Sequence, residues 1–150
     1  MKRNKYAVPL LISLTLFVLS ACNSATSIDS ITIDGIDLQV ISASLHESYM
    51  IGAQEYSPRS SSDLLLLVRA KISDTDSELD LSNWEAQVQD ESGRVSNSDI
   101  SSKITGTIEG QEGTFLEWFF VVDRNVKEVT IIIRDHELDI SPILNQSSED

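Results

Sequence analysis

Cysteine, histidine and basic residues are scarce in this sequence of 150 residues. Its single cysteine, Cys22, has no partner for an intramolecular disulfide, and a metal site built from several thiolates is excluded. The only histidines are His46 and His136. Asp135-His136-Glu137 could suggest a general base, but neighbouring residues of a strand point to opposite faces, so we expect a surface histidine. No nucleophile elbow, zinc-protease motif or phosphate-binding glycine loop is present. The sequence therefore predicts a protein that is not an enzyme.

Basic residues are outnumbered by acidic ones, 11 against 24, which gives a formal net charge of −13. Three of the basic residues, Lys2, Arg3 and Lys5, precede an uncharged apolar segment. Without residues 1–21, 8 basic and 24 acidic residues remain, and the net charge becomes −16. Such a surface repels phosphate backbones and anionic lipid headgroups. We therefore expect no nucleic-acid partner and no electrostatic attachment to a membrane.

Residues 1–21 have the order of an export signal, with positive charges first and an apolar run from Ala7 to Ala21 afterwards. That run is shorter than the roughly 20 residues needed for a membrane-spanning helix, and it contains Pro9. It ends in Leu19-Ser20-Ala21-Cys22, which resembles the lipobox of bacterial lipoproteins at all four positions. An ordinary secretory signal that happens to contain a cysteine is the alternative.

The lipobox resemblance implies that Cys22 carries a diacylglyceryl group, with acyl chains such as palmitate, and that cleavage falls between Ala21 and Cys22. Two acyl chains are enough for stable anchoring. The resemblance thus implies a protein held by lipid on the extracytoplasmic face of the cell membrane. Asn23 is not the aspartate associated with inner-membrane retention, so in a host with two membranes we expect the outer one.

After the signal, the sequence divides into three parts. Residues 22–30 form a lipidated cysteine with a Ser/Thr-rich segment that we expect to be a flexible tether. Residues 31–144 form one domain, and residues 145–150 are polar enough to be a disordered tail.

Alternation of apolar and polar residues predicts strands throughout the domain. The phase of the alternation reverses near Val40, which predicts a β-bulge or a change of sheet there. A continuous apolar run, Leu64–Val68, favours a strand, and Asp90–Gly93 has the composition of a turn. Trp84 lies on an alternating face and is expected to pack between sheets. About seven short strands separated by turns predict an all-β fold, an antiparallel β-sandwich.

The same segments resemble the immunoglobulin-like, telokin-like domains of unknown function that follow lipoboxes in many bacterial lipoproteins. The segments that carry the resemblance are Asp63–Ser73, Asp74–Asp80, Trp84–Gly93, Thr114–Val122 and Glu128–Arg134. The resemblance implies an immunoglobulin-like sandwich and an extracytoplasmic location. It implies no activity.

An acidic segment between two predicted strands could bind a divalent cation. Its carboxylates fall at alternating positions close to the register of a calcium loop; they are Asp74, Asp76, Glu78, Asp80 and Glu85. Leu79 stands where such a loop needs glycine, and the flanking segments are strands instead of helices. Calcium is thus a possible ligand, and a solvated acidic turn is the alternative.

The segment His46–Ser62 shows no strand pattern and is long for a loop in a compact domain. It contains residues typical of contact surfaces, and the candidate partner-binding residues are Tyr49, Met50, Ile51, Tyr56 and Arg59. A loop whose apolar residues fold back on the sandwich is the alternative.

These features favour a lipid-anchored, non-catalytic binding module whose partner the sequence does not identify; a protein partner is possible. A calcium-dependent adhesion or binding module is the second hypothesis, and an accessory protein or inhibitor of a cell-envelope enzyme is the third.

Overall fold

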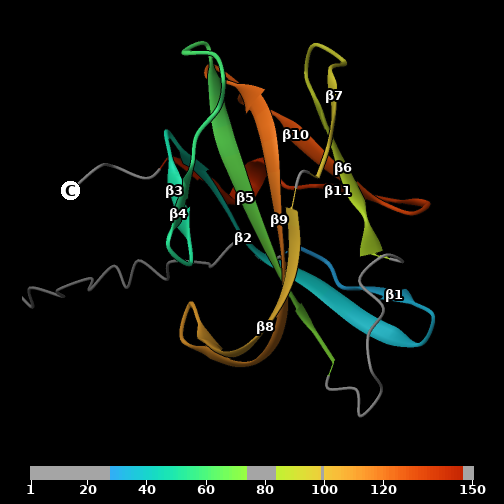
Figure 1. Cartoon of the computed structure of the whole chain (residues 1–150). Coiled ribbons are helices and arrows are strands. Elements are labelled where there is room, and N and C mark those ends of the chain that lie inside the picture. The colour runs from blue at the N-terminus through green and yellow to red at the C-terminus, as the bar shows by residue number, and fades with distance from the viewer. Residues whose placement is uncertain (1–27, 74–83, 99, 147–150) are drawn as a thin grey trace, which may run out of the picture.

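The computed structural model describes residues 28–73, 84–98 and 100–146, and all of its extended segments belong to β-sheets. Two antiparallel sheets pack against each other, which confirms the predicted all-β sandwich (Figure 1). The strands are β1 Ile31–Ile33, β2 Ile36–His46, β3 Tyr49–Ile51, β4 Gln54–Tyr56, β5 Asp63–Ile72, β6 Ala86–Asp90, β7 Val95–Asn97, β8 Ile100–Ile108, β9 Gln111–Asp123, β10 Val129–Ile133, β11 His136–Asp139 and β12 Leu144–Gln146. Several of these are three-residue segments, so the chain divides more finely than the predicted seven strands.

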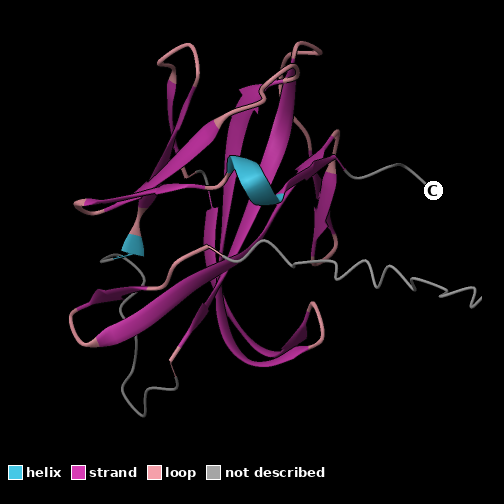
Figure 2. Ribbon diagram, turned by 180° about the vertical axis from the view of Figure 1, so that it is seen from behind, coloured by secondary structure: helices cyan, strands magenta, loops and turns pink. Residues whose placement is uncertain are grey.

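The larger sheet has the order β1-β2-β5-β9-β8, and β12 pairs with β2 as its one parallel neighbour. The smaller sheet has the order β11-β10-β6-β7. The third pairing is the separate hairpin β3–β4, beside the larger sheet in Figure 1. In the view from behind, the short 3-10 turn η2, Ser141–Ile143, leads into β12 (Figure 2). Among the described residues, no helix is long and apolar enough to cross a bilayer.

The hydrophobic core lies between the two sheets and takes alternate residues from each strand. From β9 it contains Leu116, Trp118, Phe120 and Val122. Trp118 is fully buried, and its indole Nε1 donates a hydrogen bond to the carbonyl oxygen of Trp84 at 2.7 Å. Trp84 itself is only 4% exposed, so its predicted packing between the sheets is confirmed.

The predicted change of phase near Val40 is also confirmed. The register of β2 against β5 shifts between Val40 and Ser42, so one residue of β2 is left without a partner in the pairing. The irregularity turns Ala43 and Leu45 back toward the core.

The sequence-based boundaries need three corrections. His46–Ser62 is not an unpatterned loop, because it contains the hairpin β3–β4. Asn145 and Gln146 are not a disordered tail, because β12 pairs with β2. Ile28 was assigned to the tether, yet it is 8% exposed and belongs to the core. In each of the three segments, burial of an apolar side chain or backbone pairing produces a structure that the local sequence pattern did not predict.

Candidate binding site

The larger sheet buries side chains on its outer face as well as on its core face. On β5 the core takes Leu64, Leu66 and Val68, so the residues between them point outward. Leu67 lies opposite Phe119 of β9 and Arg69 lies opposite Glu117. Phe119 is 3% exposed although it is not part of the core between the sheets. Something must therefore cover this outer face, and the hairpin β3–β4 does so.

A buried ion pair lies beneath the hairpin. Arg69 Nε is 2.6 Å from Glu117 Oε1, and Glu117 is the only charged residue that is buried among the described ones. The hydroxyl of Ser102 donates to Glu117 Oε2 at 3.4 Å. Arg69 also donates from Nη2 to the hydroxyl oxygen of Tyr49 at 2.8 Å. The pair thus connects three strands of the sheet to β3.

Tyr49 holds the hairpin on the sheet through its ring as well as its hydroxyl. The ring centroid lies 5.2 Å from that of Phe119 and 5.2 Å from that of His46, within the range of favourable aromatic contacts. His46 Nε2 is 2.8 Å from the hydroxyl of Ser44. Burial, together with the positive charge of Arg69, lowers the pKa of His46 below 6.5. The histidine is therefore neutral at pH 7 and adds no second cation beside the arginine.

A pocket of about 390 Å³ opens next to the docked hairpin. Leu65, Phe119 and Val121 of the outer sheet face form its apolar part. The chain that leaves β4 forms the opposite side; the residues there are Tyr56, Ser57, Pro58, Arg59 and Asp63. This arrangement joins an apolar surface to a small number of polar groups, as in many ligand and peptide sites.

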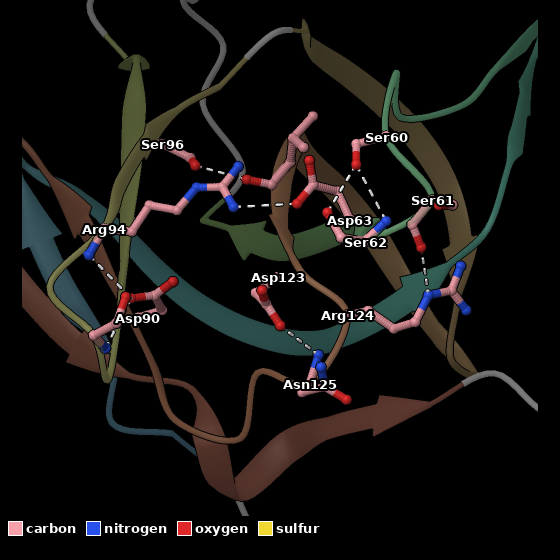
Figure 3. A network of polar contacts seen from close by, with 12 residues as sticks. Ser60, Ser61, Ser62, Asp63, Asp90, Arg94, Ser96, Asp123, Arg124 and Asn125 are labelled. Atoms are coloured by element: carbon pink, nitrogen blue, oxygen red, sulfur yellow. Dashed lines mark hydrogen bonds and ion pairs between the residues drawn. The ribbon is translucent and has the colours of Figure 1, made fainter.

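The rim of the pocket is fixed by two arginines from other loops (Figure 3). Arg124 donates from Nε to the carbonyl oxygen of Ser61 at 2.9 Å, and its backbone N–H donates to Ser62 at 2.8 Å. Arg94 lies on the other side, where Nη1 is 3.2 Å from the carboxylate of Asp63. These contacts fix Ser61, Ser62 and Asp63, at the end of the chain segment that leads from β4 to β5 beside the pocket.

Arg59 lies at the mouth of the pocket and is exposed. Within the described ranges it forms no ion pair, whereas Arg69, Arg94, Arg124 and Arg134 all do. An exposed guanidinium beside an apolar pocket can bind a carboxylate whose neighbouring apolar group enters the pocket.

The structure separates the five residues predicted for the partner-binding loop. Tyr56 and Arg59 line the pocket, and Met50 is 57% exposed at the hairpin. Tyr49 and Ile51 are half-buried, and Tyr49 serves to attach the hairpin to the sheet.

Sequence reasoning missed the apolar half of the pocket. The available pattern was β9 itself, where Phe119 alternates with Trp118 and both are large and apolar. A strand that exposes one face to water carries polar residues on that face. Large apolar residues on both faces of β9 therefore indicate that both faces are covered.

The structure gives less information about the other candidate residues. Asp74, Asp76, Glu78 and Asp80 lie outside the described residues, as do Ala21 and Cys22. Glu85 is described and exposed. The described segments contain no group of three potential metal ligands. His136 is exposed at the start of β11, as predicted for a surface histidine.

Comparison of the chain with family models, curated proteins and solved structures finds no match. Its resemblance to lipobox-bearing, immunoglobulin-like domains therefore stays a prediction.

Proposed function

We propose that this protein is a lipid-anchored, extracytoplasmic binding module without catalytic activity, and that the pocket beside the hairpin β3–β4 receives its protein partner. The observation that carries the proposal is a pocket of about 390 Å³ that combines an apolar surface with exposed Arg59, which forms no ion pair with another described residue. Pockets that hold small ligands or anchoring side chains begin at about this size, roughly 300 Å³.

The chemistry of the pocket defines the partner. Leu65, Phe119 and Val121 favour an aromatic or branched aliphatic side chain. Arg59 favours an acidic group next to it, while Asp63 already has Arg94 as its partner. The proposed partner therefore presents an apolar side chain beside a carboxylate. A cell-envelope enzyme that displays such a segment would make the protein its accessory factor or inhibitor.

The lipid anchor is part of the proposal and rests on Leu19-Ser20-Ala21-Cys22. A Cys22→Ser protein is expected to incorporate no labelled palmitate, whereas the unchanged chain incorporates it. Labelling of the serine variant to the same extent would refute lipidation at this residue and would leave the pocket proposal standing.

Binding at the pocket can be tested by crosslinking in cells. A photo-crosslinking amino acid at Ser57, which lines the pocket, should give a discrete adduct, and the same group at exposed Glu137 on the smaller sheet should not. Arg59→Glu should weaken the Ser57 adduct because it replaces the guanidinium by a carboxylate, and Val121→Trp should weaken it because the larger side chain fills the pocket. We expect about a tenfold loss for each variant, which corresponds to about 1.4 kcal/mol.

A matched charge change checks that the effect is local. Lys103→Glu alters the net charge of the protein as Arg59→Glu does, on an exposed residue of β8 away from the pocket. It should leave the Ser57 adduct unchanged. Equal adduct yields from all variants would overturn the assignment of the pocket.

A further inference from the structure

β8 is the border strand of the larger sheet. It pairs with β9 along its whole length, from Ile100 opposite Phe119 to Ile108 opposite Gln111. In the described part of the chain no strand lies on its other side (Figure 1). Nine residues of strand span about 30 Å. The backbone N–H and C=O groups directed away from β9 form a row that can pair with another extended chain.

Natural proteins protect such edges with charges, prolines or bulges. β8 has the sequence Ile-Ser-Ser-Lys-Ile-Thr-Gly-Thr-Ile, with no proline and with Lys103 as its only charge. The pairing with β9 contains no bulge. Ile104, at the centre of the strand, is 37% exposed. By comparison, β7 at the edge of the smaller sheet has only three residues.

The sequence of β8 is self-complementary about Ile104. When two copies pair antiparallel on this centre, Ile104 faces itself and Lys103 faces Thr105 of the other copy. Further out, Ser102 faces Gly106, Ser101 faces Thr107 and Ile100 faces Ile108. Cross-strand pairs of β-branched residues and of Ser with Thr are favourable. Ile104 and Ile108 are four positions apart, so their side chains fall on one face of the strand.

The lack of acidic residues within β8 reduces the repulsion between two copies along this strand. The mature chain is strongly acidic, so two copies repel each other wherever carboxylates meet. β8 contains no acidic residue, and its lysine lies opposite a threonine instead of the second lysine. The register centred on Ile104 therefore brings two copies together without opposing like charges in the strand.

We propose that β8 pairs antiparallel with β8 of a second copy of this chain, about a two-fold axis at Ile104, so that the larger sheet continues from one copy into the other. Two-fold pairing uses the same surface on both partners and closes the assembly at a dimer. The residues that line the pocket beside the hairpin β3–β4 lie outside β8, so the proposed pairing does not use them. This inference does not depend on the proposed pocket function.

Disulfide trapping in intact cells tests the register. In Ile104→Cys the two introduced thiols lie on directly opposite residues, whose Cα atoms are about 5 Å apart, within the range of disulfides. In Thr107→Cys they are offset by six residues, or about 20 Å. Both positions are exposed, so neither change disturbs the core. Mild oxidation should convert Ile104→Cys to a disulfide-linked dimer at least fivefold more than Thr107→Cys.

Two controls complete the test. The unchanged chain reports any dimer formed through Cys22, and it should give none. Adding Arg59→Glu to Ile104→Cys should leave the dimer yield unchanged, because the pocket takes no part in the pairing. Equal yields from the two cysteine positions, or no dimer from Ile104→Cys, would overturn the proposal without touching the pocket function.

Discussion

The ion pair of Arg69 with Glu117 allows a sharp test of how the hairpin is attached to the sheet. Glu117 is 6% exposed, and its close partner is Arg69 Nε at 2.6 Å. In Arg69→Met the carboxylate keeps, among the described residues, the hydroxyl of Ser102 at 3.4 Å as its one side-chain partner. The variant therefore leaves a buried negative charge with almost no compensation.

The loss of stability expected in Arg69→Met follows from the burial of the two charged partners. Removing one member of a buried pair costs about 3–5 kcal/mol. Because 20% of the Arg69 side chain is exposed, water can approach the site, and we expect the lower end, about 3 kcal/mol. At about 4 °C per kcal/mol for a domain of this size, the Tm should fall by about 12 °C. Urea unfolding of the purified protein, followed by circular dichroism, measures the free energy of unfolding, and thermal unfolding followed by the same signal measures the Tm.

The double variant Arg69→Met/Glu117→Leu separates charge burial from lost packing. It removes both charges and fills the site with apolar atoms, a change that is often neutral. The hydroxyl of Tyr49 still loses its donor, so we expect a net loss of about 1 kcal/mol. If the double variant is as unstable as Arg69→Met or less stable, the buried charge is not the cause and the reasoning fails.

Three further predictions concern single residues. Burial, aided by a neighbouring arginine, lowers the pKa of His46, so the stability it adds above its ordinary pKa of 6.5 should be lost as the pH falls. His46→Gln should flatten the free energy of unfolding between about pH 7.5 and pH 5.5 relative to the unchanged chain. Burial raises the pKa of the Asp90 carboxyl, but hydrogen bonds in its own turn, first from the Ser92 hydroxyl, outweigh it and lower that pKa. The stability present above pH 3.8 should therefore decline below it, and Asp90→Asn should remove this acid-dependent part in the same titration. Trp118→Phe leaves the buried carbonyl of Trp84 without its donor and should cost about 2 kcal/mol in urea unfolding; no loss would mean that the hydrogen bond contributes nothing.

The sequence predicted the sandwich because its core strands are long enough to show alternation. In β6, Ala86 and Val88 are buried between exposed glutamines, and Trp84 continues the same face. The bulge near Val40 was also visible, since a bulge reverses the phase of the apolar residues.

The hairpin could not be predicted in this way. Tyr49–Ile51 and Gln54–Tyr56 are three residues each, too short for a period to be recognised. Their position depends on Phe119 and Arg69, which are remote in the sequence. Likewise, β12 contains polar residues typical of a tail, and it is ordered by pairing with β2. The structure of such segments is determined by the remote residues against which they pack or pair. A local sequence pattern contains no information about those residues.

The same dependence links the pocket to the stability of the fold. Leu65, Leu67 and Phe119 are apolar on the outer face of the sheet, so this face needs the hairpin as a cover. The hairpin in turn carries the chain that forms the rim of the pocket. A change at the base of the hairpin, such as Arg69→Met, should therefore weaken folding and partner binding together. A change at exposed Arg59, such as Arg59→Glu, removes no ion pair between described residues and should weaken binding alone. A variant series in which binding and stability moved in parallel for both residues would place the binding surface elsewhere on the molecule.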